Sequence, residues 1–101
     1  MSAQEGSAVN GKVAAKVLIT GQVQGVGFRY FTTDLARSYG VNGWVKNLAT
    51  GDVEVKVEGD KGAVSGFLKE LKIGPRHGHI SNFQIEWKPY EGKFDSFQVR
   101  F

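Results

Sequence analysis

The sequence contains 101 residues, with 13 lysines and arginines, 10 aspartates and glutamates and no cysteine. This length holds one domain, and the lack of cysteine excludes disulfide bonds, thiolate nucleophiles and cysteine-ligated zinc. A chain without cysteine also fits the reducing cytoplasm, where we expect this protein to act. No stretch approaches the roughly 18 apolar residues of a membrane-spanning helix. The basic residues are scattered along the sequence, so we expect neither a membrane nor a nucleic acid as partner.

The first half of the chain alternates between strand and helix patterns. Residues 1–12 lack the basic start and apolar run of a signal peptide, so we predict a flexible tail there and one domain over residues 13–101. From Val13 to Ile19 the odd-numbered residues are all apolar, which predicts a strand with one buried face. After a glycine-rich stretch, apolar residues recur at helical spacing over residues 28–39, which predicts a helix that Gly40 ends.

The next segment predicts a hairpin and a second helix. Residues 41–48 and 53–58 have strand patterns, and the second alternates valine with charged residues. Asp60 is a candidate N-cap of the following helix, and Gly74 ends it. The apolar stripe of this helix consists of Val64, Phe67, Leu68 and Leu71.

Two further alternating segments, residues 83–88 and 96–101, predict the last strands. The order strand, helix, strand, strand, helix, strand, with one terminal strand, is that of the ferredoxin-like split βαβ fold. We therefore predict an α+β sandwich in which two helices cover one face of an antiparallel sheet of four to five strands. This fold hosts many unrelated functions, so the function must be argued from particular residues.

The segment from Gly21 to Arg29 joins the first strand to the first helix. Its glycines allow successive amides to turn toward one point, and the helix start adds unpaired donors, so the segment can cradle a phosphate. Arg29 adds a permanently charged planar fork that can hold two phosphate oxygens. No Lys-Ser/Thr pair follows, so this is not a nucleotide P-loop. Such turns are also common without a ligand, and the residues alone leave both interpretations open.

Asn47 is the second candidate residue. Alternation places its side chain on the same sheet face as Val45, the face that the helices should cover. An inward-facing amide at the end of a strand needs partners, because an unpaired buried polar group costs about 1–3 kcal/mol. Water and substrate are candidate partners. The alternative is that Asn47 only supports the turn from Leu48 to Gly51.

Together, the two segments resemble the acylphosphatase family. Residues 21–29 match its first motif, G-x-V-Q-G-V-x-F-R, and residues 43–59 match its second, which runs from Gly-aromatic-Val-Lys-Asn to a final glycine. The resemblance extends from about Val13 to Phe101. It implies a hydrolase that splits the carboxyl–phosphate bond of an acyl phosphate into a carboxylate and inorganic phosphate, with no metal or other cofactor.

The resemblance also implies roles for individual residues. Arg29 would bind the phosphate, and Asn47 would orient the attacking water. The amides of the cradle would complete a substrate-binding set of Gln24, Gly25, Val26, Gly27, Phe28 and Arg29. The small size of the chain leads us to expect a monomer.

Several polar residues do not suggest a site. His77 and His79 have no third ligand nearby in the sequence, which makes a weak metal signal. We expect Asp34 on a helix surface and Asp52 in a turn rather than as an acid/base pair. Trp44 and Lys46 should face away from the helices.

Three other functions are compatible with this fold. Ferredoxin-like sheets can stack RNA bases on exposed aromatic residues, but the third predicted strand lacks that pattern and carries Glu54, Lys56 and Glu58. Similar domains occur in larger hydrogenase-maturation proteins that handle carbamoyl phosphate, and we expect no second catalytic domain here. The third is an inactive relative used for binding, which the intact Arg29 and Asn47 disfavour.

Overall fold

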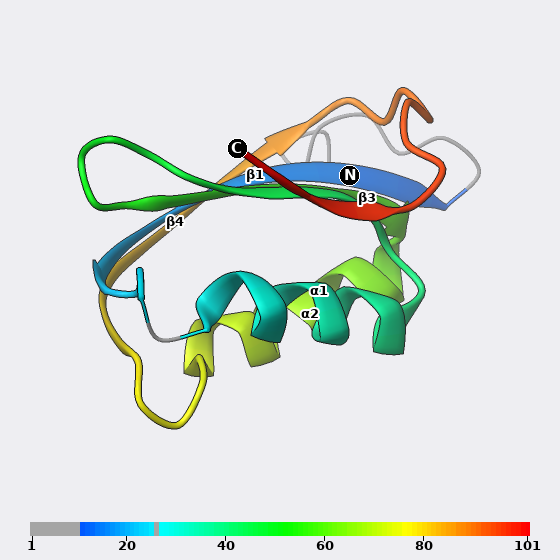
Figure 1. Ribbon diagram of the computed structural model, residues 1–101. Coiled ribbons are helices and arrows are strands. Elements are labelled where there is room, and N and C mark those ends of the chain that lie inside the picture. The colour runs from blue at the N-terminus through cyan, green and yellow to red at the C-terminus, as the bar shows by residue number, and fades with distance from the viewer. Residues whose placement is uncertain (1–10, 26) are drawn as a thin grey trace.

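The computed structural model describes residues 11–25 and 27–101 of the chain (Figure 1). In this part of the chain, five strands and two helices follow one another as β1 (Lys12–Gln22), α1 (Phe28–Tyr39), β2 (Asn42–Asn47), β3 (Val53–Asp60), α2 (Lys61–Ile73), β4 (His79–Lys88) and β5 (Phe97–Arg100). The order of elements is the predicted one. β1 begins at Lys12, one residue before the predicted start of the domain, and most of the predicted tail lies outside the described residues. The boundary between tail and domain therefore stays a prediction.

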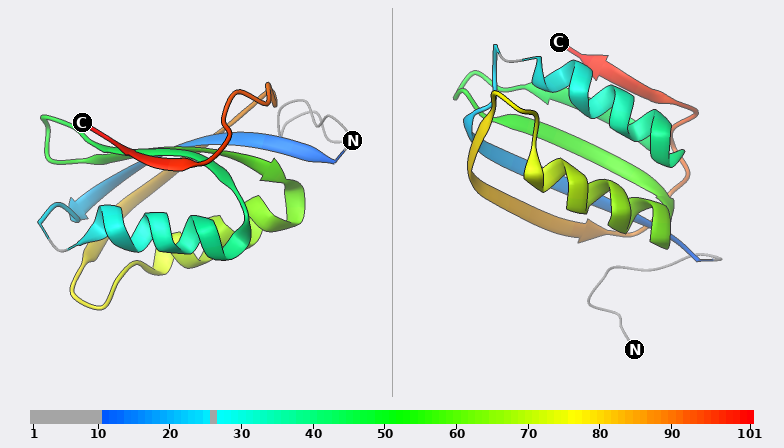
Figure 2. Two further views of the ribbon diagram at one scale, coloured as in Figure 1. Left: turned by 45° about the vertical axis from the view of Figure 1, so that its right-hand side comes forward. Right: turned by 90° about the horizontal axis from the view of Figure 1, so that it is seen from below.

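The five strands form one sheet in the order β4-β1-β3-β2-β5. Three of its strand pairs are antiparallel, but β5 runs parallel to β2, so the sheet is mixed and not antiparallel throughout as predicted. Both helices cover the same face, α1 on the side of β5 and α2 on the side of β4 (Figure 2). The predicted ferredoxin-like α+β fold is confirmed.

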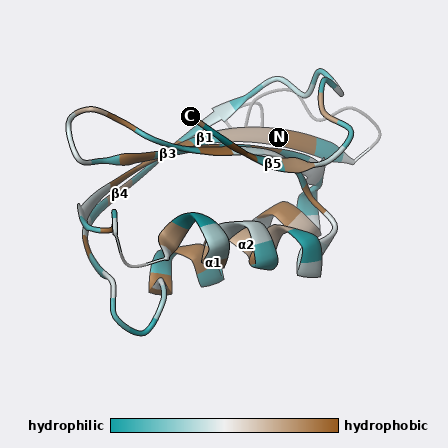
Figure 3. Ribbon diagram, viewed as in Figure 1, coloured by the Kyte–Doolittle hydropathy of each residue, from teal (hydrophilic) through white to brown (hydrophobic). Residues whose placement is uncertain are grey.

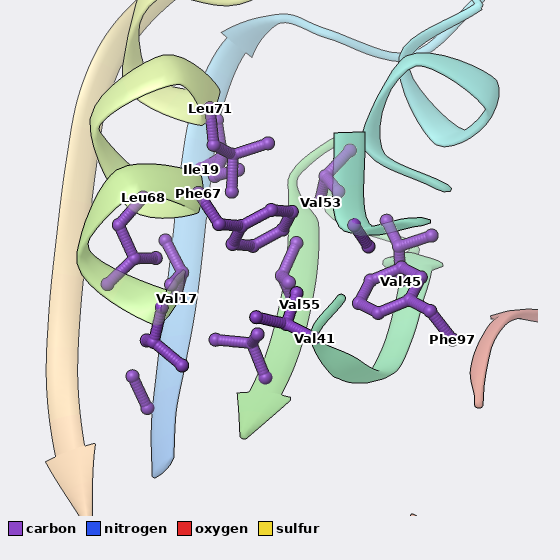
Figure 4. Packing of buried hydrophobic residues seen from close by; sticks show 14 of the residues in the cluster. Val17, Ile19, Val41, Val45, Val53, Val55, Phe67, Leu68, Leu71 and Phe97 are labelled. Atoms are coloured by element: carbon purple, nitrogen blue, oxygen red, sulfur yellow. The ribbon is translucent and has the colours of Figure 1, made fainter. Parts of the chain in front are cut away.

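The core lies between the helices and the covered face of the sheet (Figure 4). Alternate valines of β3, which are Val53, Val55 and Val57, are fully buried there, as the valine/charged alternation predicts. All four residues of the predicted stripe of α2 are buried as well. In Figure 3 each helix carries both hydrophobic and hydrophilic residues, as a helix with one covered face should. Each such buried aliphatic side chain stabilises the fold by about 1.5–3 kcal/mol.

The helix ends follow the predictions with one exception. Gly40 adopts a left-handed conformation (φ 69°) after α1, and its amide donates to the carbonyls of Ala36 and Arg37. Asp60 occupies the N-cap position of α2, but its side chain makes no capping hydrogen bond. It accepts one from Lys12 Nζ at 3.1 Å instead. Neither described helix is long and apolar enough to cross a membrane.

The connection between β4 and β5 crosses the open face of the sheet, because these strands are its two edges (Figure 1). Phe94 fixes this connection through its backbone. Its amide donates to Glu58 Oε1 at 3.1 Å, and its carbonyl accepts from Asn42 Nδ2 at 3.1 Å. Glu58, a residue of the open face, is consequently only 3% exposed.

Candidate active site

The glycine-rich segment between β1 and α1 depends on backbone conformations that favour glycine. Gly25 and Gly27 have φ angles of 79° and 73°, and a Cβ at either position would meet no atom within 4 Å. The left-handed conformation, and not a lack of space, therefore requires glycine at these two positions. Val26, which was predicted to belong to the cradle, lies outside the described residues.

This segment and the end of β2 enclose a pocket of about 240 Å³. Its lining brings together the described residues of the predicted site and two others: Val23, Gln24, Gly25, Gly27, Phe28, Arg29, Tyr30 and Asn47. Arg29 and Asn47 thus meet at one pocket although they belong to different elements, α1 and β2.

The start of α1 faces this pocket with its amides free of a side-chain cap. Gly27 is the N-cap residue and offers no side chain, and no acidic residue stands in the first turn. The hydroxyls of Thr32 and Thr33 donate to the carbonyls of Phe28 and Arg29, both at 2.8 Å, which holds the first turn in place. Unpaired amides and the helix dipole both favour an anion at this point.

Arg29 supplies the positive charge of the pocket. Its guanidinium carbon lies 5.1 Å from the centre of the Phe101 ring, a cation–π contact that restrains a half-exposed side chain. No carboxylate of the described residues forms an ion pair with Arg29. The guanidinium therefore keeps its donors available for a bound anion.

Asn47 is the last residue of β2 and pairs with Val53 of β3. Its Oδ1 atom is buried and accepts no hydrogen bond from any described residue. Because an unsatisfied buried acceptor costs about 1–3 kcal/mol, this oxygen is suited to accept a hydrogen bond from a molecule in the pocket. The prediction that Asn47 faces the helix-covered side is confirmed, since its side chain lines the pocket beneath α1.

Gln24 has a second role that the sequence did not reveal. Its side-chain Nε2 donates to the carbonyl of Leu48 at 2.9 Å and to that of Asp52 at 2.8 Å. The resemblance to the family implies a role only for its backbone amide. Gln22, two residues earlier, is exposed. Nothing in the sequence indicates that Gln24, and not Gln22, makes these hydrogen bonds.

Asp34 and Asp52 lie where they were expected, whereas His79, which was expected in the loop before the fourth strand, is the first residue of β4. Asp34 is exposed on α1 and pairs with Arg37 at 4.0 Å, while Asp52 accepts a hydrogen bond from the Thr50 hydroxyl in the turn. Neither aspartate lines the pocket. His77 and His79 are exposed, and nowhere in residues 11–25 and 27–101 do three histidine, aspartate or glutamate side chains gather as a metal site would need.

Comparisons with known proteins show the family of this chain. The sequence model of a family described as Acylphosphatase matches residues 15–99. The acylphosphatase of Geobacter sulfurreducens is 43% identical over 90 residues, which is 89% of this chain and 99% of that protein. The acylphosphatase of Anaeromyxobacter dehalogenans is 38% identical over 90 residues, 89% of this chain and 97% of that protein.

Solved structures show the same likeness. The crystal structure of the acylphosphatase from Bacillus subtilis superposes with a TM-score of 0.85 and 29% identity, over 88% of this chain and 99% of that one. Full-length HypF in its phosphate- and nucleotide-bound form also superposes, with a TM-score of 0.81 and 30% identity, but only 12% of that chain is covered. Since the family model and the curated relatives span nearly the whole described domain, the chain belongs to the acylphosphatase family of hydrolases.

Proposed function

We propose that this chain hydrolyses acyl phosphates in the pocket between the glycine-rich segment and the end of β2. Arg29 and the amides from Gln24 to Arg29 hold the phosphoryl group, and Asn47 orients the attacking water. The observation that carries the proposal is the meeting, in one pocket, of an unpaired guanidinium, an uncapped helix start and the buried, unpaired Oδ1 of Asn47.

The chemistry of an acyl phosphate suits a site of this kind. Its leaving group is a carboxylate with a pKa of roughly 4, so the departure needs little help from an acid. The remaining work is to hold the phosphoryl group, stabilise the charge on its equatorial oxygens and align the water. Arg29 and the amides of the cradle supply the first two functions.

Asn47 aligns the attacking water. Its amide can accept a hydrogen bond through Oδ1 and donate one through Nδ2, so it can fix both the position and the orientation of a water molecule. The water oxygen then bonds to phosphorus while the bond from phosphorus to the acyl oxygen breaks. We assign the proton of the water to a phosphate oxygen of the substrate, since neither histidine nor carboxylate stands among the described lining residues.

The proposal includes three expectations about the working protein. The reaction needs no metal, because positioning and backbone donors account for every step. The chain acts as a monomer, and it acts in the cytoplasm. Its physiological acyl phosphate depends on contacts with the acyl end, which the phosphate cradle does not select.

The test is the hydrolysis of benzoyl phosphate in excess EDTA, with Arg29→Ala beside the unchanged chain. Losing one preorganised charge-stabilising contact costs roughly 3–4 kcal/mol, so kcat/KM should fall by about 10²–10³ in this variant. Arg37→Ala is the matched control, because Arg37 is exposed on the same helix and lies outside the pocket. Turnover that needs a metal, or that survives in Arg29→Ala, would contradict the proposal.

A further inference from the structure

The open face of the sheet gathers basic residues that are scattered in the sequence. We call this region the basic hollow. It has a volume of about 460 Å³ and is lined by Lys16, Trp44, Lys46, Glu54, Lys56, Lys93, Phe94 and Arg100. It shares no lining residue with the candidate active site. The fold therefore brings together basic residues that are scattered in the sequence.

The lining of the hollow carries a net positive charge. Its lining holds five cations and one carboxylate, a net charge of +4, whereas the full chain has a formal charge of +3. Glu91 stands beside the hollow and pairs with Lys93 at 2.9 Å, and counting it leaves a net charge of +3 there. The rest of the chain carries eight basic and eight acidic residues (13 − 5 and 10 − 2), so it adds nothing to the net charge.

Like charges face one another across neighbouring strands in the hollow. Lys16 of β1 stands directly opposite Lys56 of β3, and Lys46 of β2 pairs with Arg100 of β5. Like charges in such positions destabilise a sheet. Lys16 is compensated by Glu54 at 3.4 Å.

Three of the other four cations of the lining, Lys46, Lys56 and Arg100, form no such ion pair with a described residue, although Glu54 stands opposite Lys46 in the register of β2 with β3 and Glu86 and Glu91 attract Lys56 from a longer distance. Within the described residues, no carboxylate lies within 4.0 Å of the charged atoms of Lys46, Lys56 or Arg100. A bound anion would relieve this repulsion.

The ring of Trp44 contacts two of these three cations. The guanidinium carbon of Arg100 lies 5.1 Å from the centre of its ring, and Lys46 Nζ lies 5.9 Å from it. These cation–π contacts keep both charges over one ring instead of letting them spread into solvent. The cations are thus positioned before any ligand arrives.

We propose that the basic hollow binds a small molecule that carries several negative charges close together, of the class of linked phosphate groups. Arg100 supplies a fork for two phosphate oxygens, and Lys46 and Lys56 supply point charges beside it. The volume falls in the range of about 300–1,000 Å³ typical of small-molecule sites.

A compact ligand fits better than a nucleic acid strand. The connection that carries Lys93 and Phe94 bounds the hollow on one side. On β4, Glu86 stands opposite Lys16 of β1 and forms an ion pair with Lys88. These features interrupt the continuous basic track that a polymer backbone needs.

The probe for this site is inorganic tripolyphosphate, titrated into the Arg29→Ala variant so that the guanidinium of the phosphate cradle does not contribute. The titration is run at about 0.15 M salt, where exposed charges more than about 8 Å apart are largely screened. We expect saturable one-to-one binding in calorimetry and a change in tryptophan fluorescence. The fluorescence change should vanish in Trp44→Phe, because Trp87 faces the core and not the hollow. Inorganic phosphate should bind about tenfold more weakly or worse, since it can reach fewer of the cations.

The decisive comparison is between two double variants made in the Arg29→Ala chain. Lys46→Gln with Arg100→Gln should weaken tripolyphosphate binding by about tenfold or more. Lys69→Gln with Lys72→Gln removes the same charge from exposed positions of α2 and should leave the affinity within about twofold, since screened distant charges contribute little. Thermal melting checks that both double variants are folded.

Three outcomes would overturn the proposal. The first is a lack of saturable binding, and the second is an equal loss in both double variants, which would mean attraction by net charge alone. The third is a single-stranded oligonucleotide that binds more tightly than tripolyphosphate and loses that binding in the Lys46/Arg100 variant, which would make the occupant a nucleic acid.

Discussion

The side chain of Gln24 donates hydrogen bonds to the carbonyls of Leu48 and Asp52, at 2.9 and 2.8 Å, across the candidate active site. One residue therefore ties the glycine-rich segment before α1 to the turn after β2. Arg29 follows the first of these segments, and Asn47 directly precedes the second. The relative position of the two proposed functional residues depends on this contact.

Gln24→Ala should lower activity more than it lowers stability. Two net hydrogen bonds contribute about 1–3 kcal/mol to folding, whereas a misplacement of about 1 Å can reduce a rate roughly 10²-fold. We expect kcat/KM for benzoyl phosphate to fall by about 10- to 100-fold while urea denaturation still shows a cooperative transition. Gln22→Ala is the control, because Gln22 is exposed two residues earlier. Equal activity in the two variants would show that the contact does not position the site.

Asn47→Ala should separate phosphate binding from turnover. The substitution removes the proposed contact to water but leaves Arg29 and the amides in place, so kcat should fall by about 10²–10³. Competitive inhibition by inorganic phosphate should change little. Asn82→Ala, at an exposed position of β4, controls for the loss of an asparagine. Near-native turnover in Asn47→Ala would show that Asn47 does not orient the attacking water.

Local patterns in the sequence predicted the elements, and the sheet face on which Asn47 lies, well. The valine alternation of β3 and the apolar stripe of α2 each report directly on one buried face, so periodicity was enough to find them. Asn47 was placed correctly by the same alternation, counted from Val45. Such predictions succeed because one residue's environment follows from its near neighbours in the chain.

Features that depend on distant pairing were missed. The parallel pairing of β5 with β2 follows from the path of the 89–96 connection over the open face, which no local pattern encodes. The basic hollow arises because Lys16, Lys56 and Arg100 come from three different strands. The tether of Gln24 and the ion pair of Asp60 with Lys12 are also contacts between distant segments.

Substitution of glycine by alanine should change the stability of the fold in opposite directions at Gly43 and Gly62. A Cβ at Gly43, where φ is 145°, would lie 1.8 Å from the carbonyl oxygen of Lys56 in the paired strand. Gly43→Ala should therefore destabilise the fold by about 3 kcal/mol or more, because backbone must move. At Gly62, in α2, a Cβ meets no atom within 4 Å. Gly62→Ala should stabilise the fold by about 0.5–1 kcal/mol, since alanine favours a helix.

Urea denaturation of the two glycine variants measures both changes in the free energy of unfolding. A loss of stability in Gly62→Ala would mean that this first turn of α2 is not helical in solution. A small effect in Gly43→Ala would mean that β2 and β3 are less closely paired than the register of Gly43 with Val57 requires.

The contact between Tyr39 of α1 and Glu70 of α2 should make the stability of the fold depend on pH. The Tyr39 hydroxyl donates a hydrogen bond to the Glu70 carboxylate, and this contact, together with burial and the nearby negative charge, raises the pKa of Tyr39 above its ordinary value of 10.0. A group whose pKa is higher in the folded than in the unfolded chain stabilises the fold below its unfolded pKa. That stabilisation is lost as the pH rises through the folded pKa. The unfolding free energies of the unchanged chain and Tyr39→Phe should therefore converge above about pH 10.

The absorbance of tyrosinate measures the shift directly. In a chain with Tyr30→Phe and Tyr90→Phe, the remaining Tyr39 should titrate above pH 10.0, and adding Glu70→Gln should bring its pKa back toward that value. Lys72→Gln is the control, because it changes the charge of the same helix two residues away from Glu70 and leaves the hydrogen bond intact. If Glu70→Gln leaves the titration unchanged, the contact that joins α1 to α2 at this point does not persist in solution, and packing alone holds the two helices together.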